Sequence, residues 1–112
     1  MKYQIIVNDL VEAFNSKDVE LFLKYFKSDA HVFDRGEKKD ITGISSIRRW
    51  FDETNSSFDF QTELHSSEEI VQGFRFNALV KGDFQGSPIT FCYEGIVNNG
   101  KVLRLDISIG KR

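Results

Sequence analysis

Residues 14–34 read FNSKDVELFLKYFKSDAHVFD, and this stretch decides the fold because it leads from one helix through a second helix into a strand. Apolar side chains recur at positions i, i+3, i+4 and i+7 of the second helix, as Val19, Phe22, Leu23 and Phe26. That spacing predicts a single buried face. Asp18 stands just before it, and a short carboxylate there can accept a hydrogen bond from a free N–H group of the first turn. The sequence therefore predicts a short, capped helix.

The same stretch ends on a carboxylate that shares a face with apolar residues. Residues 30–34 alternate as a strand does, so Val32 and Asp34 point to the same side. If Val32 faces the core, Asp34 faces it too, and a charged carboxylate is costly to bury without partners. Asp34 is therefore the first candidate for a functional residue. The alternative is a structural role, in which Asp34 accepts hydrogen bonds from loop N–H groups near Gly36 or Gly43.

The period of the apolar residues changes once along the chain. We expect helices over residues 2–15, 18–27 and 44–54, with a polar loop at 35–40. From residue 57 onward the period is two, which predicts four long antiparallel strands. Helices followed by strands is the order of an α+β protein rather than of alternating βαβ units.

The final hairpin can be placed in register from its turn. Asn99 and Gly100 suit the positive φ angles of a two-residue turn, which sets Val97 opposite Val102 and Glu94 opposite Leu105. One face of the hairpin is then aliphatic except for Glu94, and we expect it to be concave; it holds Thr90, Cys92, Glu94, Ile96, Leu103, Leu105, Ile107 and Ile109. The other face holds Phe91, Tyr93, Arg104 and Asp106.

Composition limits the classes of partner. The chain has 112 residues, which predicts one domain with one core, and eleven phenylalanines supply bulky side chains for it. A net charge of −2 without basic runs gives no reason to expect nucleic acid or a membrane as partner. The single cysteine excludes an internal disulfide and favours a reducing, cytoplasmic location. Two histidines and one cysteine without paired spacing predict no metal site, and no cofactor is expected.

A set of positions in the first half of the chain points to a known family: Asn15, Asp18, Phe26, Asp29, Ala30, Asp34, Gly43, Ile47 and Arg48. This set resembles the SnoaL-like families of the nuclear transport factor 2-like superfamily, which also contains the ketosteroid isomerases. The resemblance covers nearly the whole chain. It implies a cone-shaped α+β fold, in which a curved antiparallel sheet wraps around three N-terminal helices. It does not define the function, because cyclases, isomerases, dehydratases, hydrolases and non-catalytic proteins share this scaffold.

The resemblance to the ketosteroid isomerases is partial at the site. Their catalytic base falls at the position of Asp34. Their second, protonated aspartate falls at Cys92 or within one residue of it, and their two tyrosines fall at Leu10 and Phe51. Leucine and phenylalanine cannot donate a hydrogen bond. The resemblance thus implies a base without its hydrogen-bond donors, which argues against steroid isomerase activity. An Asp34–His65 pair, as some relatives have, is disfavoured because His65 alternates with Leu64.

We therefore predict a cavity with two catalytic carboxylates, Asp34 as base and Glu94 as its partner. Two carboxylates in one apolar cavity leave one ionised and one protonated, which suits proton abstraction next to a carbonyl. The other lining residues are expected to be Leu10, Phe14, Trp50, Phe51, Phe76, Cys92, Ile107 and Ile109. Alternatively, Glu94 is solvated at the cavity mouth or paired with an arginine such as Arg75.

The predicted function is that of a small-molecule pocket protein. The first hypothesis is acid–base catalysis, of the isomerase, cyclase or dehydratase kind, on a small and largely apolar substrate. The alternative is a non-catalytic ligand-binding or dimerisation module. A homodimer is expected through the convex face of the sheet, with Tyr93 and Arg104 near its centre, because tyrosine and arginine often anchor interfaces. A monomer with a local cluster of Tyr93, Arg104 and Asp106 is the alternative.

Overall fold

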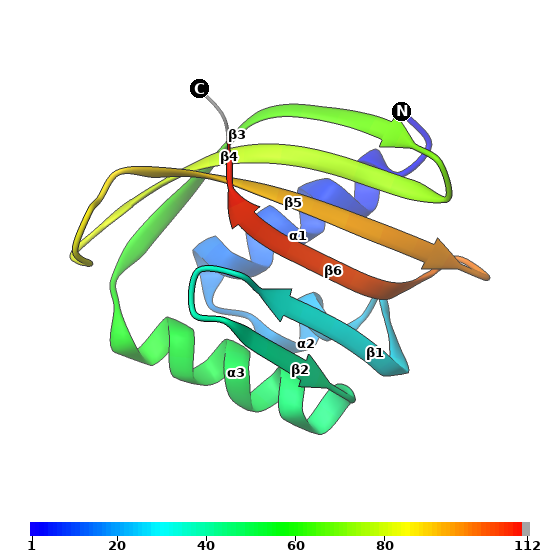
Figure 1. Cartoon of the computed structure of the whole chain (residues 1–112), viewed down its shortest axis with the longest axis horizontal. Coiled ribbons are helices and arrows are strands. Elements are labelled where there is room, and N and C mark those ends of the chain that lie inside the picture. Colours follow the sequence, from blue (N-terminus) through cyan, green and yellow to red (C-terminus); the bar gives the residue numbers. More distant parts are fainter. Residues whose placement is uncertain (111–112) are drawn as a thin grey trace.

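The computed structural model describes residues 1–110, which form three helices and one six-stranded sheet (Figure 1). In chain order the elements are α1 (Gln4–Ser16), α2 (Val19–Leu23), β1 (Phe26–Asp34), β2 (Lys39–Thr42), α3 (Ile44–Ser57), β3 (Phe60–Ile70), β4 (Gly73–Gly82), β5 (Ile89–Asn98) and β6 (Lys101–Ile109). The predicted α+β class and the three helices are confirmed. None of these helices is long and apolar enough to cross a membrane.

The strands lie in the order β2-β1-β6-β5-β4-β3. The four long strands predicted from the alternating half of the chain form one antiparallel series, β3 to β6. The sheet as a whole is mixed, because β1 pairs with β6 in parallel. This parallel pairing brings the first strand of the chain beside the last one, so that Asp34 lies opposite Ile107.

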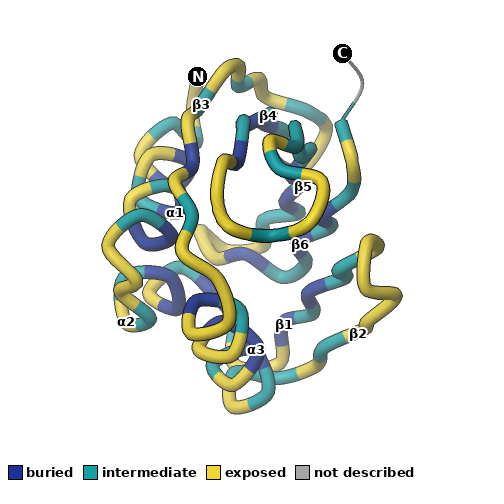
Figure 2. The backbone as a smooth tube through the Cα atoms, turned by 90° about the vertical axis from the view of Figure 1, so that its left-hand side faces the viewer, coloured by how far each residue is buried: buried dark blue, intermediate teal, exposed yellow. Residues whose placement is uncertain are grey.

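The core fills the space between the helices and one face of the sheet. Figure 2 shows the three helices together on one side of the strands. Phenylalanine rings pack against one another in this core: Phe22 and Phe51 lie 4.6 Å apart between ring centroids, and Phe14 stacks on Phe51 at 5.6 Å. The alternation predicted for β4 is confirmed, since Phe74 and Phe76 are both fully buried. Large aromatic side chains let a short chain bury enough apolar area for one core.

The second helix is shorter than predicted. Asp18 caps it as expected, accepting a hydrogen bond from the backbone N–H of Leu21 at 3.1 Å. The helix ends at Leu23, however, and Phe26 already begins β1, beside Val102 of β6. A helix of five residues forms few internal hydrogen bonds, which do little to offset the cost of starting it. The residues that follow Leu23 therefore pair with β6 instead of extending the helix. Phe26 is buried as predicted, but from a strand.

The predicted polar loop contains a strand. Residues 39–42 form β2, which pairs with β1 from His31↔Thr42 to Asp34↔Lys39. β2 is mostly exposed, so it shows none of the apolar alternation by which strands are recognised in sequence. It supplies hydrogen-bond partners to the backbone of β1, which would otherwise be an open edge.

One extra residue in β6 changes the register of the final hairpin. Val97 pairs with Val102 as predicted, but Ile96 then pairs with Arg104, so Leu103 forms a β-bulge. Val102 and Leu105 are both fully buried, although strict alternation would put residues three apart on opposite faces. The bulge lets both reach the core.

The bulge reverses the predicted faces of β5. Beyond it, Tyr93 pairs with Ile107 and Glu94 with Asp106, so Tyr93 faces the helices and Glu94 faces away from them. Gly95 is also on the inner side, where a Cβ atom would lie 2.2 Å from the ring of Phe74. Only glycine leaves room for that ring to pack directly on β5.

Candidate functional site

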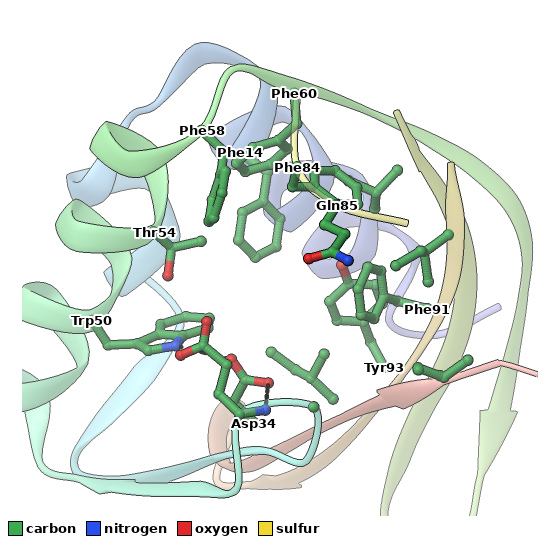
Figure 3. A pocket seen from close by; sticks show the side chains of 16 residues that line it. Phe14, Asp34, Trp50, Thr54, Phe58, Phe60, Phe84, Gln85, Phe91 and Tyr93 are labelled. Carbon is green, nitrogen blue, oxygen red and sulfur yellow. Dashed lines mark hydrogen bonds between the residues drawn. The ribbon is translucent and has the colours of Figure 1, made fainter. Parts of the chain in front are cut away.

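A cavity of about 560 Å³ opens on the inner side of the sheet (Figure 3). Phe14, Trp50 and Phe58 contribute from the helices and the residue after α3. The strands and the β4–β5 loop contribute four more aromatic residues: Phe60, Phe84, Phe91 and Tyr93. Aliphatic walls come from Val80, Ile89, Ile107 and Ile109. Such walls suit an apolar ligand, with orientation left to a few polar groups.

Asp34 is the best-positioned polar group of the cavity. It is the last residue of β1, and the next backbone N–H, that of Arg35, donates to the carbonyl of Ile107 at 3.0 Å. The Trp50 indole Nε1–H donates to Asp34 Oδ2 at 3.3 Å, and the Glu37 backbone N–H donates to Oδ1 at 3.4 Å. Asp34 therefore combines the two roles considered from sequence, because it accepts a loop N–H and also lines the cavity. Both partners donate, so the carboxylate keeps lone pairs for a ligand.

Tyr93 is a polar residue of the site that the sequence analysis placed on the opposite face. Its side chain is only 5% exposed, its ring stacks on Phe76 with centroids 4.5 Å apart, and it lines the cavity. Its hydroxyl makes no hydrogen bond to any of residues 1–110. Burial, and secondarily the charge of Asp34, raise the pKa of Tyr93 well above its usual range. Tyr93 thus stays a protonated hydrogen-bond donor in the same cavity as Asp34.

The remaining polar lining is sparse. Thr54 and Gln85 line the cavity with their side chains in view in Figure 3. Glu37 also lines it, but its carboxylate forms an ion pair with Lys39 at 3.0 Å. Asp34 is accordingly the carboxylate of the cavity wall that has no cationic partner among the described residues.

The predicted lining set is half right. Phe14, Trp50, Ile107 and Ile109 line the cavity as predicted. Leu10, Phe51 and Phe76 do not line it; they are fully buried in the core, where helices and sheet are in direct contact. The period of apolar residues predicts that these three side chains face inward, but it cannot separate a residue that fills the core from one that borders a void.

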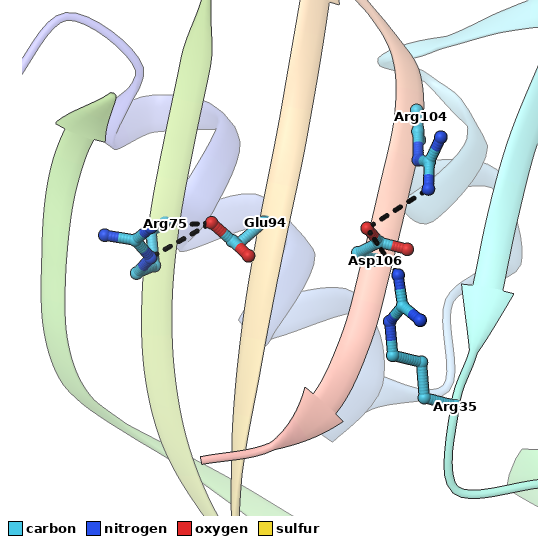
Figure 4. Close-up of polar contacts among 5 residues, drawn as sticks. All are labelled: Arg35, Arg75, Glu94, Arg104 and Asp106. Carbon is cyan, nitrogen blue, oxygen red and sulfur yellow. Dashed lines mark hydrogen bonds and ion pairs between the residues drawn. The ribbon is translucent and has the colours of Figure 1, made fainter. Parts of the chain in front are cut away.

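The prediction that Glu94 lies in the cavity is wrong. Glu94 lies on the outer face of the sheet, where Arg75 donates to its Oε2 from Nη2 at 2.7 Å and from Nε at 3.1 Å (Figure 4). Arg75 also pairs with Glu68 at 2.6 Å. The alternative role for Glu94, as partner of Arg75, is therefore the one observed. The expected pair of catalytic carboxylates does not exist.

Cys92 shares the outer face with Glu94, so its predicted place in the cavity wall is wrong as well. It pairs with Ser108 and is a free, half-buried thiol. Burial, followed by the charge of Glu94, raises the pKa of the Cys92 thiol. A protonated thiol away from the cavity is a poor nucleophile. The reason for the misplacement is again the bulge, which moves every residue of β5 to the opposite face.

The same reversal changes the expected dimer surface. Tyr93 and Phe91 line the cavity and are absent from the outer face. Tyr93 thus cannot stand at the centre of a sheet-to-sheet contact. Of the four residues predicted for that face, Arg104 and Asp106 remain on it, and Asp106 pairs with both Arg35 and Arg104 at 3.4 Å (Figure 4). The homodimer itself stays a prediction.

Other titratable clusters offer no second site. His65 is exposed and bonds to Glu63 at 3.1 Å, so the disfavoured Asp34–His65 pair is not formed. Within residues 1–110, no group of three His, Cys, Asp or Glu side chains is arranged to hold a metal ion.

The sheet curves around the three helices, and an apolar cavity of small-molecule size lies between them. This arrangement defines an α+β cone protein. Comparison with protein families and with curated proteins finds no match. Solved structures do match. A candidate polyketide cyclase from Sinorhizobium meliloti is 29% identical with a TM-score of 0.84, over 92% of this chain and 93% of that one.

Two further structures share the fold at lower identity. A protein from Catenulispora acidiphila with a ketosteroid isomerase-like fold, solved with trimethylamine, has 14% identity and a TM-score of 0.82 over 94% of this chain and 85% of that one. A SnoaL-like protein of unknown function from Burkholderia thailandensis has 11% identity and a TM-score of 0.81 over 96% and 94%. The chain therefore shares the fold of the nuclear transport factor 2-like proteins.

Proposed function

We propose that this protein binds a small, largely apolar molecule in the cavity and that Asp34 removes a proton from it as a general base. One observation carries the proposal: a carboxylate held by two N–H donors opens onto a cavity whose walls are otherwise mostly apolar. A base fixed in this way needs little reorganisation before it accepts a proton. General bases typically contribute about 10²–10⁴-fold to a rate.

Tyr93 gives the reaction its second group. When Asp34 takes a proton from a carbon next to a carbonyl, the electron pair of the C–H bond moves toward the carbonyl oxygen. A hydrogen-bond donor aimed at that oxygen stabilises the charge that develops there. Tyr93 lines the same cavity, and its hydroxyl stays protonated, since burial and the Asp34 charge raise its pKa. The protonated Asp34 then returns its proton to the product.

The comparison with known structures supports the same chemistry. The Sinorhizobium meliloti protein with 29% identity is a candidate polyketide cyclase. Ring closure by condensation of a polyketide begins with loss of a proton next to a carbonyl. The proposal for this chain therefore covers isomerisation, cyclisation and dehydration, which share that first step.

A passive binding protein is the second candidate function. The observation that favours it is the position of Glu94 on the outer face, which leaves Asp34 without the acidic partner that the isomerases have. The positions of the isomerase tyrosines are taken by Leu10 and Phe51, both buried in the core. On this view Asp34 only orients the ligand.

The two functions are separated by proton exchange. The protein is incubated in D₂O with 2-tetralone, an apolar cyclic ketone, and exchange of the protons next to the carbonyl is followed by NMR. We expect at least about tenfold faster exchange than in buffer, and loss of the acceleration in Asp34→Asn. Glu94→Gln is the matched control, because it makes the same chemical change on the outer face and should leave the rate unaltered.

Binding without exchange would contradict the base role and favour the passive function. Binding is read independently from the fluorescence of Trp50, which is the one tryptophan of the chain and lines the cavity. If Glu94→Gln slows exchange as much as Asp34→Asn, the assignment of the base to the inner face is wrong.

We also propose that the protein is a cytoplasmic homodimer. The free thiol of Cys92 supports a reducing compartment, where cysteines stay unpaired. A dimer through the outer face of the sheet would place Arg104 in the contact. Its side chain is 43% exposed and lies over the ring of Phe33 at 4.2 Å, so it is held in place on that face.

A further inference from the structure

The charged side chains that line the cavity are all negative. Among the described residues, the charged side chains that line it are Asp34 and Glu37, and no lysine, arginine or histidine lines it. An anionic ligand would therefore meet like charge without a cationic partner. A cationic ligand would meet opposite charge, which a low-dielectric wall strengthens.

The surroundings of Lys39 show how this negative charge is distributed. Lys39 forms its ion pair with Glu37, and the hydrogen bond and charge of Glu37, followed by the charges of Glu53 and Asp34, raise the pKa of Lys39. Three carboxylates thus act on one ammonium group at this end of the cavity. Lys39 balances Glu37, whereas Asp34 receives only the neutral N–H groups of Trp50 and Glu37. Asp34 is therefore the cavity carboxylate that forms no ion pair among the described residues.

Aromatic rings supply the second feature that a cation requires. Seven of the sixteen lining residues are aromatic. The faces of these rings carry partial negative charge, and they attract alkylated ammonium groups within about 6 Å of the ring centre. Trp50, the strongest of the ring types for this interaction, both lines the cavity and donates to Asp34. Figure 3 shows the labelled rings grouped around the same opening as Asp34.

We propose that the ligand of this cavity is an apolar molecule that carries an alkylated ammonium group, with the cation seated between Asp34 and the aromatic rings. This inference rests on the proposed function, since it specifies the substrate class of the same cavity. The two roles of Asp34 are compatible. A cation next to a C–H bond makes that proton more acidic, so the carboxylate that attracts the cation is also placed to remove the proton.

The test compares two probes of the same shape. Benzyltrimethylammonium carries a permanent charge, and neopentylbenzene is its neutral counterpart with carbon in place of nitrogen. Binding of both to the complete protein is followed through Trp50 fluorescence and calorimetry. We expect the cation to bind at least about tenfold more tightly than the neutral probe, and Asp34→Asn to remove most of that difference. Glu94→Gln, which removes a carboxylate of the outer face, should leave both affinities unchanged.

Equal or tighter binding of neopentylbenzene would overturn the inference and leave the proposed apolar cavity function standing. Cation binding that is unaltered in Asp34→Asn would overturn it as well, because the cation would then bind elsewhere. If neither probe binds, the inference and the proposed function both fail. Should Asp34→Asn fold poorly, the comparison of the two probes on the unaltered chain decides by itself.

Discussion

The position of Tyr93 can be tested by alkaline unfolding, without knowledge of the ligand. Burial, and then the charge of Asp34, raise the pKa of this phenol in the folded chain, whereas the unfolded phenol ionises near pH 10. Below pH 10 the phenol keeps its proton in both the folded and the unfolded chain, so Tyr93 does not change the free energy of unfolding with pH. Above pH 10 the unfolded state loses its proton first, so the free energy of unfolding falls as pH rises. For one site whose unfolded pKa is near 10, the loss is about 1 kcal/mol between pH 10 and pH 11.

Tyr93→Phe removes the hydroxyl and keeps the ring that stacks on Phe76. We expect the unaltered chain to lose about 1 kcal/mol more than Tyr93→Phe over this interval, as measured by urea unfolding with circular dichroism at a series of pH values. Tyr25→Phe is the control. The Tyr25 hydroxyl donates to Asp9, and this hydrogen bond also raises the pKa of Tyr25. Because the Tyr25 ring is far more open to solvent than that of Tyr93, its contribution to the pH dependence should be smaller. Parallel pH curves for the unaltered chain and Tyr93→Phe would show that Tyr93 faces solvent, and would refute the bulged register.

Other substitutions test the packing and the assembly. Phe26→Ala and Ile47→Ala should each cost about 2–5 kcal/mol in urea unfolding, because both side chains are buried, whereas exposed Arg49→Ala should change stability by less than about 0.5 kcal/mol; equal costs would mean that the buried faces of β1 and α3 are misassigned. Gly95→Ala should cost about 1–3 kcal/mol, since its Cβ would overlap a phenylalanine ring, and an unaltered midpoint would contradict that close contact. Sedimentation at micromolar concentration should show a species of twice the 12.9 kDa chain mass that Arg104→Glu dissociates; a 12.9 kDa species for the unaltered chain would rule the dimer out.

The parts of the fold that follow from side-chain period were predictable. The cap at Asp18, the helix that begins at Ile44 and the buried face of β4 all depend on local spacing against one apolar surface. Strand β2 was not predictable in this way, because an exposed strand that only completes the hydrogen bonds of its neighbour needs no apolar pattern. The parallel contact of β1 with β6 depends on residues some seventy positions apart. No local pattern encodes that contact.

The candidate site also contains one residue that local spacing predicts and one that it does not. Asp34 was found because it is a charged residue in phase with a buried strand face, and no insertion separates it from Val32. Tyr93 was missed because its face was counted from the turn through Leu103, where the ladder is interrupted. Two signals were available in the sequence. Val102 and Leu105 are both apolar but lie three positions apart, so they can face the core together only if a bulge separates them. Glu94 can also reach an opposite charge, that of Arg75, in the neighbouring strand.

The residue inserted at Leu103 therefore decides which polar side chains line the cavity. Without the bulge at Leu103, Glu94 would face the apolar core and Tyr93 would face water, so a carboxylate would be buried away from Arg75 and an aromatic ring would leave its stack. Burying an unpaired charge costs several kcal/mol, far more than the one ladder position that the bulge gives up. The free energy thus favours the bulged register strongly, and with it a cavity that holds one carboxylate and one phenol. A base with a neutral hydrogen-bond donor suits charge that moves from a C–H bond to an oxygen, whereas the expected pair of carboxylates would have needed a shared proton to coexist.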